Sequence, residues 1–217
     1  MGGKWGLWGF IDLPYSPLRM SGTTAHEHVG QFFDEPANVG RAAATFLLDD
    51  ARPGTTLLIV AKPAHWRAIA DELEWRRYPL ESRMLDGRLQ VLDSTAMLLQ
   101  LLTDGALDSA RFDSVIGSLV SELADASPGG LRIFGDIVDV LADRGNLQDA
   151  CMLEACWNRL AQIVPFSLFC GYSSMNLAGP GTVNMRRAIC HSHTRMAIDA
   201  LDPLGVFLVQ SSAGIAR

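Results

Sequence analysis

Short apolar segments alternate with amphipathic segments along most of the chain. Five apolar runs predict β-strands, over residues 28–33, 55–61, 89–93, 131–135 and 165–172. The second run (TTLLIVA) is apolar beyond its two threonines, as expected of a strand covered on both faces. Between the runs, apolar side chains recur at spacings of three and four, which predicts helices. This alternation is typical of an α/β fold with three layers, in which helices flank a mostly parallel sheet.

The two ends of the chain are less regular than its middle. The segment 181–191 is predicted to be the last helix of the core, and the apolar run 206–209 (VFLV) is expected to add a final strand. No linker long enough to separate two domains is visible. We therefore expect an N-terminal tail over residues 1–25, one domain over 26–200, and a C-terminal tail or edge strand over 201–217.

Composition and charge argue against several classes of protein. Of the 217 residues, 48% are hydrophobic and 19% are charged, enough apolar material for one sizeable core. Eighteen Lys and Arg stand against 24 Asp and Glu, without any basic run, which argues against direct binding of nucleic acid. No apolar stretch reaches the roughly 18 residues of a membrane span. The four cysteines form no CxxC pair and no disulfide scaffold, which indicates a reducing cytoplasm.

Ligands of parallel α/β sheets bind outside the carboxyl ends of the strands, and this rule selects candidate residues. Lys62 follows the second strand, Asp136 follows the fourth, and Tyr172 ends the fifth. The turn at Lys62 reads AKPAHW; it lacks glycine, and Pro63 removes an N–H where a phosphate would bind. A working P-loop is therefore disfavoured, although Lys62 could still contact an anion. Asp136 could receive a polar ligand or a metal, or simply cap the next helix.

Glu154 is the most informative single residue. It lies in the middle of the apolar stripe of the helix predicted over 147–163. Burial of a carboxylate without partners is costly, so Glu154 should be paired, hydrogen-bonded or turned toward a cavity. A structural salt bridge to Arg132 or Arg159 is the alternative to a role in ligand binding.

The histidines give weaker indications. His191, at the end of a helix, is expected to cap that helix or to line a pocket. Cys190, His191 and His193 lack the spacing of a zinc site, so no metal is expected. His26 and His28, which flank the first strand, are expected to be exposed loop residues. The sequence contains no nucleophile elbow, HExxH or dinucleotide-binding motif, and this absence favours binding over catalysis.

Five segments taken together resemble the MEDS domain, a sensory module of methanogens and methylotrophs that also forms the sensor part of a dichloromethane-responsive regulator. The most specific segment covers residues 134–173 (FGDIVDVLADRGNLQDACMLEACWNRLAQIVPFSLFCGYS), and the shorter ones read HVGQFFD, PGTTLLIVAKPAHW, GRLQVLDS and CHSHTRMAI. The resemblance spans about residues 27–198. It implies a RecA-like fold with a degenerate P-loop and a role in sensing small molecules or signals. The chain departs from the family at Gly135-Asp136, where Gly-Glu is usual, so any inherited contact of that carboxylate is in doubt.

The sequence thus predicts a cytoplasmic, non-enzymatic sensory domain that regulates a separate signalling or transcription partner, with no cofactor assigned. Its pocket is expected at the carboxyl edge of the sheet. The candidate ligand-binding residues are Lys62, Asp136, Glu154, Asn158, Tyr172 and His191. The last four also match the family pattern. Two alternatives are a divergent RecA-like ATPase that uses Lys62 and Asp136, and a constitutive protein-interaction module.

Overall fold

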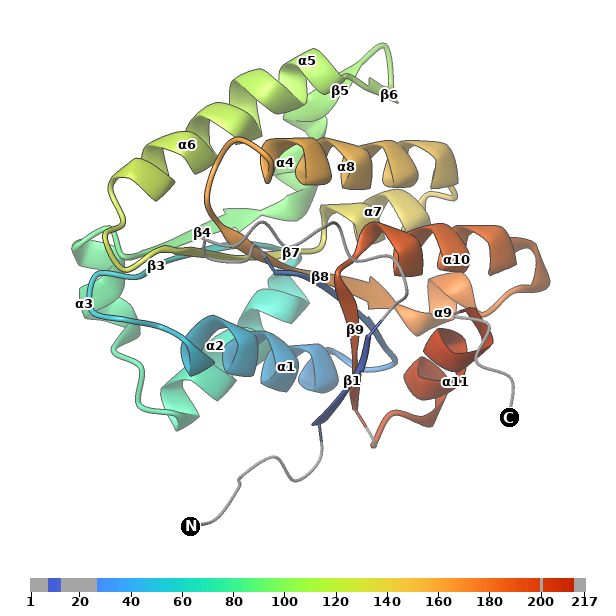
Figure 1. The fold of residues 1–217 in the computed structure, drawn as a ribbon, viewed down its shortest axis with the longest axis horizontal. Coiled ribbons are helices and arrows are strands. Elements are labelled where there is room, and N and C mark those ends of the chain that lie inside the picture. The colour runs from blue at the N-terminus through green and yellow to red at the C-terminus, as the bar shows by residue number, and fades with distance from the viewer. Residues whose placement is uncertain (1–7, 13–26, 200, 213–217) are drawn as a thin grey trace.

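A seven-stranded sheet with helices on both faces organises the protein (Figure 1). The computed structural model describes residues 8–12, 27–199 and 201–212. Across the sheet the strands follow the order β1 (Trp8–Asp12), β9 (Arg195–Asp199), β2 (His28–Phe33), β8 (Ser167–Ser173), β7 (Leu131–Gly135), β3 (Thr56–Ala61) and β4 (Leu89–Asp93). Six strands are parallel, and β1 pairs antiparallel with β9 at one edge. The three-layer α/β fold predicted from the sequence is confirmed, whereas the degenerate P-loop stays a prediction.

The helices divide between the two faces according to the direction in which the chain crosses the sheet (Figure 1). One face carries α1 (Pro36–Asp49) and α2 (Pro63–Trp75). The other carries α4 (Ser94–Leu101), α6 (Ser118–Asp125), α7 (Ile137–Asp143), α8 (Leu147–Leu160) and α10 (Val183–Ser192). Helices that follow the adjacent strands β2 and β8 therefore lie on opposite faces, and so do the helices that follow the adjacent strands β7 and β3. Ligands of open α/β sheets bind between such strands.

Shorter elements complete the connections. They are α3 (Leu80–Leu85), the hairpin of β5 (Leu102–Thr103) and β6 (Ala106–Leu107), α5 (Ser109–Phe112), the π-helical turn Asp113–Gly117, α9 (Ser174–Leu177) and the 3-10 turn Pro180–Thr182. The helix α11 (Pro203–Ser212) follows the last strand. None of the helices within the described residues is long and apolar enough to cross a membrane.

Two apolar cores form because neighbouring residues of each strand face opposite sides of the sheet. On the α1 side, Val39, Leu47 and Ile69 are completely buried against the sheet. On the α8 side, the core includes Leu153, Trp157 and the even-numbered residues of β2 and β8. The second core holds a group of polar side chains in its middle.

The two ends of the chain differ from the sequence prediction. Residues 203–212 form the helix α11 and not a strand, so the strand predicted at 206–209 is wrong. Its buried positions, Gly205, Leu208, Val209 and Ser212, are spaced by three and four residues, which is the period of a helix face. The helix packs against β2, β9 and α10. At the other end, residues 8–12 form β1, while the rest of the predicted N-terminal tail lies outside the described residues.

Candidate functional site

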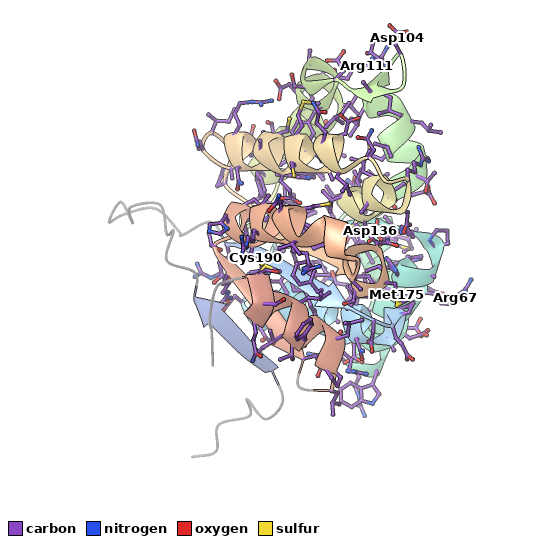
Figure 2. The ribbon with its side chains drawn as sticks, turned by 90° about the vertical axis from the view of Figure 1, so that its right-hand side faces the viewer. Arg67, Asp104, Arg111, Asp136, Met175 and Cys190 are labelled. Atoms are coloured by element: carbon purple, nitrogen blue, oxygen red, sulfur yellow. The ribbon has the colours of Figure 1, made fainter. Side chains whose placement is uncertain are left out.

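A first polar network ties together the carboxyl ends of β3, β7 and β8. Asp136, fully buried directly after β7, accepts a hydrogen bond at Oδ2 from the backbone N–H of Lys62 at 2.9 Å. The same oxygen lies 2.6 Å from Nδ1 of His65. Its other oxygen, Oδ1, is buried and has no hydrogen-bond partner among the described residues. In Figure 2, Asp136 lies between the helical layers of the two faces.

The side chain of Lys62 is taken up by this network. Its ammonium donates to Oδ2 of Asp139 at 2.8 Å and also to Asp143. Asp139 in turn accepts at Oδ1 from the backbone N–H of Ser173 at 2.7 Å. Burial raises the pKa of Asp139 against the opposing effect of Lys62. Burial also opposes the charge of Lys62, but the two carboxylates outweigh it and raise the Lys62 pKa. An ammonium engaged by two carboxylates is poorly placed to receive an anion.

A second group of polar side chains lies inside the core beneath α8. We call it the buried cluster; it consists of His28, Glu154, Cys170 and His193. All four side chains are almost completely buried, and their ligand atoms lie within 4.8 Å of one another. Nε2 of His28 is 3.3 Å from Oε2 of Glu154 and 3.4 Å from Sγ of Cys170. Nε2 of His193 is 3.8 Å from the same Glu154 oxygen.

Local structure explains why these residues meet. In the parallel pair of β2 and β8, Gly30 is opposite Cys170, so His28 and Cys170 point to the same face of the sheet. Glu154 and Asn158 are four residues apart on α8, so both face that side of the sheet. His193 follows the last residue of α10 and leads the chain into β9. Its imidazole approaches the backbone of Gly30, where no side chain intervenes.

Hydrogen bonds fix the orientation of both imidazoles. Nδ2 of Asn158 donates to the carbonyl of Ser192 at 2.9 Å, so its Oδ1 faces Nδ1 of His28, also at 2.9 Å. That contact requires a proton on Nδ1 of His28. Nδ1 of His193 likewise donates to the carbonyl of Ile189 at 2.6 Å. The network therefore assigns lone pairs to both Nε2 atoms, and both face Glu154.

The cluster then has more acceptors than donors. Oε1 of Glu154 accepts a short hydrogen bond from the Tyr172 hydroxyl, which also lies 3.2 Å from Nε2 of His193. Oε2 of Glu154 is buried without a hydrogen-bond partner among the described residues. The thiol of Cys170 is the remaining donor nearby. When Glu154 is ionised, two imidazole lone pairs and one carboxylate oxygen thus converge on a single weak donor, the Cys170 thiol.

Burial dominates the protonation states of the cluster. It lowers the pKa of His28 to about 4 and that of His193 well below its usual value. It raises the pKa of Glu154 to about 7. It also raises the pKa values of the Cys170 thiol and the Tyr172 phenol well above their usual range. At neutral pH both imidazoles are therefore uncharged, and Glu154 is divided between its protonated and its ionised form.

The six residues predicted to line one pocket are divided by the structure. Lys62 and Asp136 belong to the network at the carboxyl edge, whereas Glu154 and Tyr172 lie at the buried cluster, with Asn158 behind His28. His191 joins neither group. It is exposed, and its Nδ1 lies 2.6 Å from the carbonyl of Arg187 in its own helix. Whether these residues bind a ligand stays a prediction.

Glu154 and His28 are both buried, and neither Arg132 nor Arg159 reaches Glu154. Glu154 is buried, as its place in the apolar stripe predicted. The salt bridge considered for it is wrong, because Arg159 pairs with Asp113 and Arg132 donates to the carbonyl of Phe46. The expectation that His28 is exposed is also wrong, since β2 begins at that residue and carries it into the core. His26 lies outside the described residues.

Sequence reasoning missed that His28, Cys170 and His193 meet at Glu154. The alternation of β8, in which Cys170 and Tyr172 share a face, was a usable signal for part of the cluster. Two surface hollows, of about 330 and 360 Å³, lie at the opposite, amino ends of the strands. Arg52 lines both hollows, and neither is lined by a predicted site residue.

A family model described as MEDS, the MEthanogen/methylotroph, DcmR Sensory domain, matches residues 27–192. No curated protein sequence matches the chain. The matched segment contains β2, α8 and β8, which supply three of the four residues of the buried cluster. Because the match covers well over half of its residues, the chain belongs to the MEDS family of sensory domains.

Proposed function

We propose that this chain is a non-enzymatic sensory domain that takes up a small ligand at the buried cluster and regulates a separate signalling or transcription partner. Membership of a sensory family supports the sensing role. The observation that carries the proposed site is Oε2 of Glu154, which is buried, accepts no hydrogen bond from the described residues, and faces two uncharged imidazoles.

The unpaired Oε2 of Glu154 does not stabilise the core. An unsatisfied buried polar atom costs about 1–3 kcal/mol, and replacing a buried polar group by apolar residues of similar volume is often neutral or stabilising. Groups whose pKa values are strongly shifted by burial cluster at functional sites. A cluster of four such residues in the middle of an apolar core therefore favours recognition over stability.

The position of His193 suggests how occupancy could reach the surface. This residue joins α10 to β9, and Asn158 holds the carbonyl of the preceding Ser192. A ligand that draws His193 toward Glu154 would stabilise one position of this junction. The helix α11 packs on both α10 and β9, so it would respond to the same change. Such a switch requires that the ligand bind the two positions with different affinity.

Thermal-shift measurements on the full chain test the proposal. The panel consists of small alcohols, amines and carboxylates together with Zn²⁺, Co²⁺ and Ni²⁺. We expect at least one compound to raise the melting temperature of the wild type but not of Glu154→Gln, since ligands that bind only the native state stabilise it. His191→Gln, an exposed histidine outside the cluster, is the control and should retain the shift. Shifts that are the same in wild type and Glu154→Gln would contradict the proposal.

Nucleotide hydrolysis has less support. The ammonium of Lys62 is engaged by Asp139 and Asp143, and the surrounding network is rich in carboxylates. ATP would have to displace these contacts and would meet Asp136 nearby. Calorimetric titration with ATP and Mg²⁺ should therefore show no tight binding. Tight binding with release of phosphate would favour the hydrolase instead.

A further inference from the structure

We propose that the buried cluster is a binding site for a divalent transition-metal ion such as zinc. The ligand atoms are Nε2 of His28, Nε2 of His193, Sγ of Cys170 and Oε2 of Glu154. This inference rests on the proposed function, because it identifies the chemical class of ligand for the same cluster.

The spacing of these atoms is close to that of a tetrahedral site. Zinc binds nitrogen and oxygen at about 2.0–2.2 Å and sulfur at about 2.3 Å, so neighbouring ligand atoms are about 3.3–3.6 Å apart. The distances from Nε2 of His28 to Oε2 of Glu154 and to Sγ of Cys170 are 3.3 and 3.4 Å. The distance from Nε2 of His193 to the same Glu154 oxygen is 3.8 Å. Small side-chain movements would bring all four atoms, now within 4.8 Å, to one ion.

The surrounding residues orient the ligands as the neighbours of a metal site do. Metal-binding histidines almost always donate their other ring N–H to a carbonyl or carboxylate, which fixes the tautomer. Asn158 supplies this acceptor for His28, and the carbonyl of Ile189 supplies it for His193. The Tyr172 hydroxyl donates to Oε1 of Glu154 and leaves Oε2 free for an ion. Each ligand that needs orientation therefore has an orienting partner.

The size of the site and its donor types favour a transition metal over other occupants. The four side chains of the cluster are almost completely buried, so an organic molecule would have to open the core. A single ion fills the space between four converging atoms and neutralises the excess of acceptors. Two imidazoles, a thiolate and one carboxylate suit zinc or related ions, whereas magnesium and calcium require mainly oxygen ligands.

Binding has a defined proton balance at the sulfur. The thiol of Cys170 must lose its proton to become a ligand, as must any Glu154 carboxyl that is protonated, and these protons pass to solvent as the bonds to the metal form. Burial makes the free thiol hard to ionise, but direct coordination deprotonates a thiol outright. Metal uptake should therefore release protons, which calorimetry in buffers of different ionisation enthalpy detects.

Cobalt spectroscopy on the full chain tests the site directly. Protein freed of metal by a chelator is titrated with Co²⁺ and, in parallel, with Zn²⁺. We expect one equivalent of Co²⁺ to give the visible bands of a tetrahedral complex and a near-ultraviolet sulfur-to-cobalt band. Cys170→Ser should lose the sulfur band and weaken Zn²⁺ binding by more than about 100-fold, a larger loss than removal of an orienting neighbour causes. Cys190→Ser, also a buried cysteine, but outside the cluster, should keep both.

The outcomes separate the metal inference from the proposed function. Absence of stoichiometric Co²⁺ binding by the wild type, or a sulfur band that survives in Cys170→Ser, overturns the metal site. Should Cys170→Ser fail to fold, unchanged Zn²⁺ affinity in Glu154→Gln overturns it equally. An organic compound that stabilises the wild type through Glu154, while Zn²⁺ does not bind, would overturn the metal site but support the sensory proposal. Zinc bound by all four residues without any effect on α10 would confirm the metal site and contradict the sensory proposal.

Discussion

A methyl group added at Gly30 provides a sharp test of the buried cluster. A Cβ at this position would lie 2.8 Å from Sδ of Met196 and 2.9 Å from Cδ2 of His193. Carbon atoms prefer separations of about 3.5–4.0 Å, so the imidazole of His193 must move by about 0.6 Å or more. That movement takes Nε2 of His193 away from its position 3.8 Å from Glu154.

The expected loss of stability is moderate. Overpacking of a core costs about 1–3 kcal/mol, and replacing glycine by alanine within a strand returns about 0.5–1 kcal/mol. The net loss for Gly30→Ala is therefore about 1 kcal/mol, or roughly 2–4 °C in melting temperature for a chain of this size. Zinc affinity should fall by at least about 10-fold, because one ligand is displaced from its position.

Gly171→Ala is the matched control, because it overpacks the opposite face of the sheet. A Cβ at Gly171 would lie 3.0 Å from Cγ2 of Val39 and 3.2 Å from Cε1 of Phe33, both in the core beneath α1. Thermal denaturation gives the stability of each variant, and calorimetric titration with Zn²⁺ gives its affinity for zinc. We expect similar losses of stability but retention of zinc affinity in Gly171→Ala only. Wild-type affinity for Zn²⁺ in a folded Gly30→Ala would show that His193 is not a ligand of the ion.

Further predictions concern the supports around the cluster, the network at the carboxyl edge and α11. Asn158→Ala removes two hydrogen bonds that join α8 to His28 and to the end of α10, and should lower the free energy of unfolding in urea by about 2–4 kcal/mol. Lys62→Met leaves Asp139 buried without its ammonium partner and should cost about 2 kcal/mol at pH 7. Because burial raises the pKa of Asp139, the contribution of Asp139 to stability is greatest below about pH 4 and is lost as the pH rises. Urea titrations between pH 4 and 7 should therefore show that the loss of unfolding free energy in Lys62→Met grows with pH. A loss that is the same at every pH would contradict this prediction. Leu208→Ala should cost about 2–5 kcal/mol, because this residue is buried, while Phe207→Ala, at an exposed position, should change stability by less than about 0.5 kcal/mol; equal effects would mean that α11 is not part of the core.

Much of the fold could be predicted from the sequence because its strands are short, apolar and separated by amphipathic helices. The end of the chain could not. The run Val206–Val209 is apolar throughout, and a run of four residues does not distinguish a strand from a helix. What decides the outcome is tertiary structure: β9 pairs with β1 on one side and β2 on the other, and α11 packs beside them.

The candidate site was only partly predictable for a related reason. The burial of Glu154 followed from the apolar stripe of its own helix. His28 and Cys170, in contrast, are 142 residues apart and meet only because β2 and β8 are adjacent strands. The contribution of His193 instead of His191 depends on where α10 ends, which sequence patterns define only to within one or two residues. Likewise, the acidic partners of Lys62 lie 77 and 81 residues away, beyond any local pattern.

Hydrogen exchange at α10 is the decisive measurement, since it shows whether zinc bound at the buried cluster stabilises the helix that His193 directly follows. Amides of residues 183–193 are compared in metal-free protein and at a Zn²⁺ concentration about 100 times the dissociation constant. Binding to the native state at that ratio adds about 2.7 kcal/mol, so the slowest amides should exchange roughly 100-fold more slowly. We expect this slowing in the wild type and its absence in Glu154→Gln. Exchange of α10 that is unchanged by bound zinc would contradict it.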